Sequence, residues 1–341
     1  MNIIYQLFDE QFVSELFKDR VLPLYPDFID IKKIKIRAPK KNIWETTYHV
    51  VISYETTFKT RDGKERRIPI YCSAHSEEPR KNVYDALSFL WESGFSKGYL
   101  SIPHPLFFDK KFNAVFYRGV RGRNLYQFIR EKKISEVEKI IPKAAAWFAK
   151  LHQIPAGVAK NYNPENSRIK TVIPGSSHII ERIKEDYPEY KELYQKAYKF
   201  FIDKEELFLS QTKNRWLVHG DAHPENVIKM SEKKIGVIDF TDLCLADFAR
   251  DIGAFLQQLN YMIGRKIGDK SFLEETKQSF LENYLKFSKI KIDGPLQERI
   301  IIYYHWTALR TATYFLIKHN AEPGRARTLL KEVENYLKKQ K

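Results

Sequence analysis

The feature that most constrains this chain is a polar segment, HGDAHPEN at residues 219–226, that lies between short apolar runs. Residues 216–218 lead into the segment, another apolar run follows it, and a polar turn then precedes a third run that ends at Asp239. Short apolar runs bounded by turn residues are typical of buried strands. The pattern therefore predicts strands that carry Asp221, Asn226 and Asp239 to one rim of the fold.

These three side chains are of the types that phosphoryl transfer requires. The reaction needs hard oxygen ligands for magnesium and a carboxylate that orients the attacking hydroxyl group. We interpret Asp221 as the catalytic carboxylate that faces an acceptor hydroxyl, and Asn226 and Asp239 as the metal ligands. His219 and Asp251 are expected to brace the segment by hydrogen bonds, because a histidine acts as a base only where a proton partner is placed for it.

The rest of the chain has two different patterns. Strand-like stretches fill residues 31–76, where Asp62 and Gly63 suit a tight hairpin turn. One helix and one further buried strand follow, and beyond a glycine-bearing connector most of the sequence has the apolar spacing of amphipathic helices. We therefore predict an α+β chain with a β-rich lobe at residues 1–117 and a helical lobe at residues 118–341.

Composition limits the class of protein. A hydrophobic fraction of 43% over 341 residues is enough to bury one large core or two moderate ones. Two cysteines give neither a disulfide framework nor a metal-ligand spacing, and no apolar run approaches the roughly 20 residues that span a bilayer. Asp9 and Glu10 interrupt the first apolar stretch before a signal-peptide core forms. We expect a cytoplasmic protein.

The net charge of +15 allows a basic binding face or a lysine-rich surface spread all round. Basic residues occur along the whole sequence and are interspersed with acidic ones. This distribution favours the spread surface, so a nucleic-acid partner is allowed but not favoured.

The HGDAHPEN segment with the later IDF at residues 238–240 resembles the catalytic and metal-binding motifs of a known group of small-molecule kinases. The group includes aminoglycoside phosphotransferases, choline and ethanolamine kinases, and fructosamine kinases. Residues 144–152 and 246–253 resemble the segments that flank these motifs in the family, so the resemblance covers most of the chain. It implies a bilobal protein kinase-like fold, ATP or GTP as phosphate donor, Mg²⁺, and a hydroxyl group of a small molecule as acceptor.

The first lobe departs from the family pattern in three places. Kinases of this type usually have a lysine in the third strand, a helix glutamate that holds it, and a glycine- or serine-bearing loop over the phosphates. Here the strand at residues 70–75 has no lysine, and the expected phosphate loop at residues 39–42 has no glycine. The glutamate position falls near Val83, with Asp85 as a displaced candidate.

Three interpretations follow from the missing lysine. Lys40 or Lys41 supplies the cation near the phosphates; or the nucleotide binds in an unusual mode; or the protein is a pseudokinase, a nucleotide-binding scaffold that acts through protein or nucleic-acid contacts. The nucleotide base is expected, by position alone, against Tyr117 and Gly119. The acceptor itself cannot be named, because variable helices and insertions form its pocket in such kinases.

Overall fold

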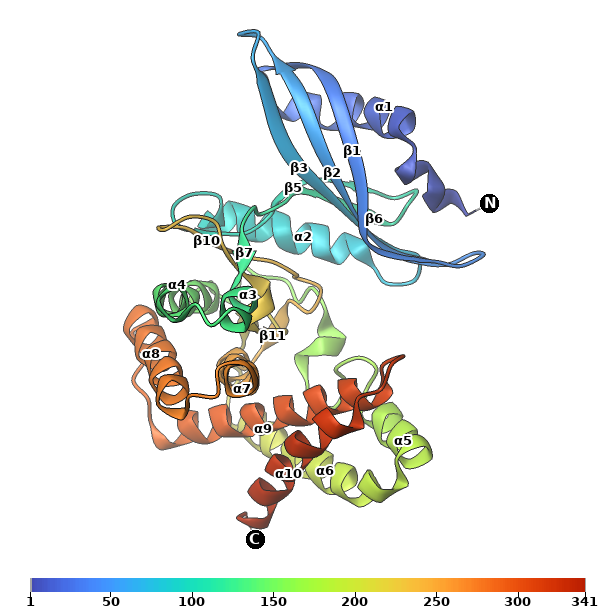
Figure 1. Cartoon of the computed structure of the whole chain (residues 1–341). Coiled ribbons are helices and arrows are strands. Elements are labelled where there is room, and N and C mark those ends of the chain that lie inside the picture. Colours follow the sequence, from blue (N-terminus) through green and yellow to red (C-terminus); the bar gives the residue numbers. More distant parts are fainter. Residues whose placement is uncertain (1, 341) are drawn as a thin grey trace. The chain divides into compact units, whose positions relative to one another are not determined.

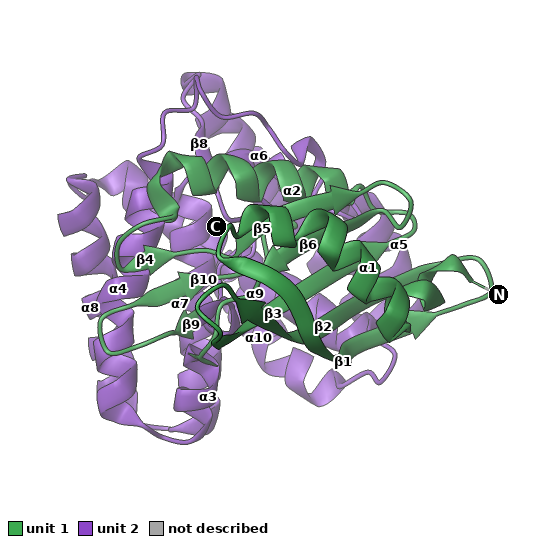
Figure 2. Ribbon diagram, turned by 90° about the horizontal axis from the view of Figure 1, so that it is seen from above, with its two compact units in different colours: residues 1–123, 228–241 green, residues 124–227, 242–341 purple. Residues whose placement is uncertain are grey.

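The computed structural model describes residues 2–340, which divide into two compact units (Figure 2). Unit 1 consists of Met1–Arg123 and Ile228–Thr241, and unit 2 consists of Asn124–Val227 and Asp242–Lys341. The sequence predicts one boundary, after residue 117. In the structure unit 1 extends six residues further, and the chain returns to it after the HGDAHPEN segment.

Unit 1 is built on an antiparallel sheet with the strand order β1-β2-β3-β6-β5. Its strands are β1 (Phe28–Ile43), β2 (Tyr48–Thr60), β3 (Glu65–His75), β5 (His104–Asp109) and β6 (Ala114–Arg118). The predicted tight turn joins β2 to β3, and Gly63 in this turn has a φ of +77°. Glycine adopts this conformation without the steric cost that a β-carbon adds.

Strand β1 is longer than the sequence indicates, and the prediction of a phosphate loop at residues 39–42 is wrong. These residues lie within β1 and continue its pairing with β2, where Lys40 is opposite Val51. Main-chain hydrogen bonds to the neighbouring strand therefore hold this stretch extended. The chain turns instead at residues 44–47, between β1 and β2.

An N-terminal segment that the sequence did not reveal covers one face of this sheet (Figure 1). It consists of a 3-10 turn (Ile3–Phe8), α1 (Glu10–Arg20) and a second 3-10 turn (Leu22–Leu24). Asp9 caps α1 by accepting the Phe12 N–H at 2.7 Å. Phe17 of α1 packs edge-on against Tyr54 of β2 and Phe116 of β6. The opposite face of the sheet carries the alternate residues of these strands.

Helix α2 (Arg80–Leu90) follows β3 and contacts β3, β5 and β6. A π-helical turn (Trp91–Phe95) continues from it. A second, small sheet has the order β4-β10-β9-β7, and its strands are β4 (Leu100–Ser101), β7 (Arg123–Asn124), β9 (Val227–Lys229) and β10 (Ile235–Val237). Strand β10 ends two residues before Asp239, so the sheet fixes the position from which that carboxylate projects.

Unit 2 is mainly helical, and with unit 1 it confirms the predicted α+β class. Its helices are α3 (Leu125–Arg130), α4 (Ile134–His152), α5 (Ser176–Asp186), α6 (Lys191–Gln211), α7 (Ala249–Lys266), α8 (Lys270–Ser288), α9 (Gly294–Ile317) and α10 (Pro323–Lys338). The 3-10 turns are Pro164–Ser167, Pro188–Tyr190 and Pro224–Asn226, and the antiparallel strands are β8 (Trp216–Val218) and β11 (Cys244–Ala246). Within residues 2–340, every helix is too short or too polar to cross a membrane.

The buried helix α7 is held close to α9. A β-carbon on Gly253 of α7 would lie 2.6 Å from the Ile300 carbonyl oxygen and 2.7 Å from the Tyr304 nitrogen. Only glycine permits this approach of the two backbones. The contact fixes the N-terminal half of α7, which supports the HGDAHPEN segment.

Candidate active site

The HGDAHPEN segment is held by buried residues at the start of α7. The Asp251 carboxylate accepts the His219 N–H at 2.7 Å and the Gly220 N–H at 3.0 Å, and Arg250 donates to the Gly220 carbonyl oxygen at 3.1 Å. Gly220 has a φ of +83°, and a β-carbon there would lie 2.3 Å from the Asp242 carbonyl oxygen. The turn therefore requires glycine, and α7 fixes its backbone.

Asp251 also belongs to a buried hydrogen-bonded chain. His152 Nε2 is 3.0 Å from Asp251 Oδ2, the oxygen that also accepts the His219 N–H, and His152 Nδ1 is 2.9 Å from the Tyr284 hydroxyl. Burial raises the pKa of Asp251, but the hydrogen bond and charge of His152, with His219 and the Gly220 amide, outweigh it and lower the pKa. A carboxylate enclosed in this way positions the segment and does not touch a substrate, as the sequence predicts.

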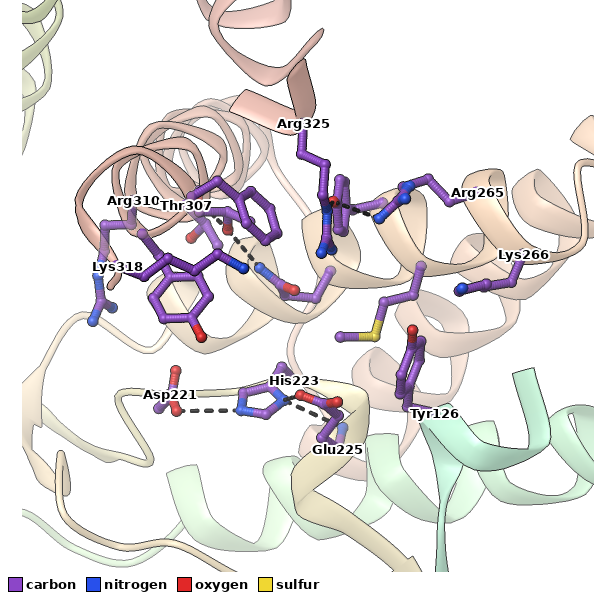
Figure 3. A pocket seen from close by; sticks show the side chains of 16 residues that line it. Tyr126, Asp221, His223, Glu225, Arg265, Lys266, Thr307, Arg310, Lys318 and Arg325 are labelled. Carbon is purple, nitrogen blue, oxygen red and sulfur yellow. Dashed lines mark hydrogen bonds and ion pairs between the residues drawn. The ribbon is translucent and has the colours of Figure 1, made fainter. Parts of the chain in front are cut away.

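Asp221 lies on the wall of a cavity with His223 beside it (Figure 3). His223 Nε2 is 3.3 Å from the Asp221 carboxylate, and His223 Nδ1 accepts the Glu225 N–H at 3.2 Å. Because Nδ1 accepts, the proton of the neutral ring is on Nε2, which can donate to Asp221. Burial raises the pKa of Asp221, but His223, Arg310 and His219 outweigh it and hold the pKa well below its usual range. Asp221 is therefore an ionised acceptor of hydrogen bonds.

The two predicted metal ligands offer the oxygen atoms that magnesium prefers. Asn226 is buried in unit 2, and its Nδ2 donates to the Asp221 carbonyl oxygen at 3.0 Å, which leaves Oδ1 as a ligand atom. Asp239 is exposed in unit 1, has a φ of +66°, and accepts the Thr241 hydroxyl at 2.9 Å. Residues 2–340 contain no cluster of three or more His, Cys, Asp or Glu suited to a metal. A carboxylate and an amide oxygen are each ligand types that Mg²⁺ accepts.

Unit 1 places a buried arginine near Asp239, on the sheet face opposite α1. Arg80, the first residue of α2, is 4% exposed. Its guanidinium group is 3.3 Å from the Thr241 hydroxyl, 2.9 Å from the Glu78 carboxylate and 3.4 Å from His49 Nε2. Its Nε is buried and has no hydrogen-bond partner among the described residues. An unpaired buried donor in a charged group is costly, so this atom indicates an acceptor that a ligand would supply.

Lys40 belongs to the same cluster. Its ammonium group is 3.1 Å from His49 Nε2. Burial and then the charge of Arg80 lower the pKa of Lys40, whereas Glu78 and Asp239 raise it. Burial, with Lys40 and Arg80, lowers the pKa of His49 to about 4, so this histidine is neutral near pH 7. Two cationic side chains thus lie around an uncharged imidazole and close to Asp239.

Lys41, the other predicted phosphate ligand, points elsewhere. Its ammonium group lies over the Phe8 ring, 4.9 Å from the ring centre, and Phe8 belongs to the segment that covers the α1 side of the sheet. Neighbouring strand residues point to opposite faces, so Lys40 and Lys41 cannot both face the cluster.

Tyr117 and Gly119 lie together, at the end of β6. The Tyr117 ring stacks on Tyr71 with centroids 5.8 Å apart, and a β-carbon on Gly119 would lie 2.3 Å from the Tyr71 ring. The Gly119 N–H donates to the Pro69 carbonyl oxygen at 2.9 Å, so this donor is already used. The position offers an aromatic surface and a carbonyl oxygen to a ligand.

The cavity next to Asp221 lies in unit 2 and has a volume of about 520 Å³. It lies between the HGDAHPEN segment and α3, α7, α9 and α10 (Figure 3). Sequence reasoning missed its lining and also Arg80, because both depend on contacts between distant parts of the chain. The only local signal for Arg80 was a basic residue at the start of the helix after β3.

The family model described as phosphotransferase enzyme family (APH) matches residues 56–289. The chain belongs to this family. Comparison with curated protein sequences found no match.

Solved structures of APH-like kinases share the fold over most of their length. Spectinomycin phosphotransferase, APH(9)-Ia, in complex with ADP and spectinomycin, is 14% identical, with a TM-score of 0.54 over 95% of this chain and 94% of that one. Ethanolamine kinase from Plasmodium vivax is 14% identical, with a TM-score of 0.55 over 90% and 83%. Choline kinase LicA from Streptococcus pneumoniae is 12% identical, with a TM-score of 0.54 over 96% and 99%. These APH-like neighbours confirm the kinase-like fold.

Proposed function

We propose that this APH-family protein is an active, ATP- and magnesium-dependent kinase that phosphorylates a hydroxyl group of a small molecule in the cytoplasm. The observation that carries the proposal is the ionised Asp221 on the cavity wall, on a backbone fixed by Asp251. In phosphoryl transfer the protein acts mainly by positioning the reacting groups. Asp221 is the carboxylate that would position the acceptor hydroxyl. GTP is the alternative donor.

In the proposed reaction the acceptor oxygen forms a bond to the γ-phosphorus, and the bond from that phosphorus to the bridging oxygen of the nucleoside diphosphate breaks. Asp221 accepts a hydrogen bond from the acceptor hydroxyl and receives its proton. Because its pKa is depressed, Asp221 is a weak base and takes the proton late, after the hydroxyl has begun to bond to phosphorus. His223 Nε2, 3.3 Å away, keeps the carboxylate oriented.

Asn226 Oδ1 and the Asp239 carboxylate would hold the magnesium ion. Bound there, magnesium neutralises charge on the phosphate oxygens. The hydrogen bonds from Asn226 Nδ2 to the Asp221 carbonyl and from Thr241 to Asp239 orient these two ligands. Such supporting hydrogen bonds commonly tune ligand affinity.

Arg80 and Lys40 would provide the positive charge that a strand lysine usually supplies. Both lie near Asp239 within unit 1, and the free Arg80 Nε supports a phosphate contact. The stacked pair of Tyr71 and Tyr117 offers its aromatic surface to the nucleotide base. This arrangement supports the interpretation that another cation takes the place of the missing lysine.

The test compares ADP formation by the wild type and by Asp221→Asn, with MgATP and a set of small hydroxyl compounds. We expect the variant to lose at least about a hundredfold in kcat while it binds ATP normally, because only the transfer step uses the carboxylate. Thermal-shift titration with ATP, with and without Mg²⁺, measures binding separately. Transfer that survives Asp221→Asn unchanged would exclude this role for Asp221.

The pseudokinase scaffold is the second candidate, and the absence of a lysine from β3 favours it. It predicts ATP binding without transfer to any acceptor. No thermal shift at millimolar ATP would contradict both candidates. Retention on heparin that collapses at modest salt would support a clustered basic face and a nucleic-acid partner.

A further inference from the structure

Most of the charged side chains that line the cavity beside Asp221 are cationic. Its carboxylates are Asp221 and Glu225, and both belong to the HGDAHPEN segment. Its cationic side chains are Arg265 and Lys266 of α7, Arg310 of α9, Lys318 directly after α9, and Arg325 of α10. Figure 3 shows Arg265 and Arg325 beside each other and away from Asp221. The cavity therefore has an acidic side at the segment and a basic side formed by the helices.

Two of these arginines converge on one uncharged atom. Arg265 Nη1 donates to the Tyr261 hydroxyl oxygen at 3.0 Å, and Arg325 Nε donates to the same oxygen at 2.6 Å. The Arg325 guanidinium also lies 3.8 Å from the centre of the Phe315 ring, which holds it in place. Like charges repel when no anion separates them, so this geometry favours the binding of an anion between or beside the two groups.

This basic side has fewer carboxylate partners than cations, and Arg310 pairs with Asp242 at 3.8 Å. Glu322 pairs with both Lys318 and Arg325, so one carboxylate serves two cations. Among the described residues, neither Arg265 nor Lys266 has a carboxylate within 4.0 Å, although Arg265 bonds to Tyr261. Arginine and lysine side chains without a carboxylate partner, gathered on one cavity wall, are suited to carboxylate or phosphate groups of a ligand.

We propose that the acceptor is an anionic hydroxy compound, with its hydroxyl at Asp221 and a carboxylate or phosphate group at Arg265, Lys266 and Arg325. This inference rests on the proposed function, because it assigns the substrate class of the same site. Acceptors with ammonium groups, such as aminoglycosides, carry the same charge as this wall and are repelled by it. The cationic wall of the cavity thus decides which small hydroxyl compounds the cavity accepts.

The inference is tested by anion binding without nucleotide. Calorimetric titration at constant ionic strength would use inorganic phosphate and glucose 6-phosphate as phosphate probes, glucuronate as the carboxylate probe, and glucose and glucosamine as neutral and cationic controls. We expect an anion to bind the wild type, with glucosamine excluded. Arg265→Gln and Arg325→Gln should each weaken anion binding about tenfold or more, because a charge-assisted hydrogen bond is lost.

A control variant tests whether the anion is bound in the cavity. Lys286→Gln removes an exposed lysine of α8 that does not line the cavity, and it should leave anion binding unchanged. Retained folding of each variant is checked by its melting temperature. No anion binding, or binding that Arg265→Gln and Arg325→Gln do not weaken, would overturn the inference.

The outcome is separable from that of the proposed function, because no phosphoryl transfer takes place in the titration. Anion binding lost in the two arginine variants, together with a wild type that never forms ADP, would support the anionic site and contradict the kinase. Transfer to glucosamine in preference to glucuronate and glucose 6-phosphate would support the kinase and contradict the anionic acceptor. The affinities measured for the phosphate probes and for glucuronate show which anion the basic side of the cavity prefers.

Discussion

Arg80 combines burial, charge and an unused donor, and no neighbouring residue of α2 has all three. Its guanidinium bonds to Glu78 and Thr241, and its Nε is unpaired among residues 2–340. Arginine presents several donors in a fixed planar arrangement, which suits phosphate oxygens. Lys40 contributes charge to the same cluster but has a lowered pKa and a single flexible ammonium group.

Replacing Arg80 should therefore affect the nucleotide more than the acceptor. We expect Arg80→Ala to raise the KM for ATP roughly tenfold to a hundredfold, because a hydrogen bond to a charged group contributes about 1.5–3 kcal/mol. The measurement is steady-state kinetics with varied ATP, with a thermal shift by ATP as a direct binding readout. Lys81→Ala, which removes the next, exposed cation, is the matched control and should change neither value. An unchanged KM for ATP in Arg80→Ala would assign the phosphates to another group.

At the scale of elements, the spacing of two helices determines whether the HGDAHPEN segment is supported. Helix α7 supplies Asp251 and Arg250 to the segment, and Gly253 sets its distance from α9. The same helix contains a second glycine, Gly264, near which a β-carbon would meet no atom within 4 Å. Alanine substitutions at these two positions therefore separate the effect of helix packing on stability from the effect of helix propensity.

Gly253→Ala should destabilise the protein by about 1–3 kcal/mol, because the added methyl group collides with the α9 backbone. Gly264→Ala should be neutral or stabilise by up to about 1 kcal/mol, because alanine favours the helix and has room. Denaturant titration measures both free energies of unfolding. Equal effects of the two substitutions would mean that the α7–α9 approach does not limit stability.

The two halves of the candidate site differ in how far the sequence could predict them. The HGDAHPEN segment was predictable because the types and spacing of its residues lie within eight positions, and the structure adds only the braces from α7. Arg80 meets Thr241 across 161 positions of the sequence, and no local pattern reports such a contact. The phosphate loop was misplaced because strand pairing, which depends on a partner strand, extends β1 through Lys40.

At the scale of the whole molecule, a net charge of +15 is distributed over both units, and several histidines are partly buried near cations. His49, His104 and His305 each have a pKa lowered to about 4, mainly by burial and further by nearby Lys or Arg side chains. His104 also stacks on Trp91 and His305 on Tyr336, so these rings are fixed in the fold. All three are neutral in the folded protein at pH 7.

Stability should therefore fall as the pH is lowered from about 6.5 towards 4. In this window the unfolded chain, whose histidines titrate near 6.5, binds protons that the folded protein does not, so protonation favours unfolding. The melting temperature measured from pH 7 to pH 4.5 should decrease, and His305→Gln should make the decrease shallower, because one of the three groups no longer titrates. The control is Lys286→Gln, which replaces an exposed lysine of α8, keeps all three histidines and should leave the slope unchanged. A slope in His305→Gln identical to that of the wild type would show that His305 takes up its proton without unfolding, and the acid sensitivity would then belong to His49 and His104.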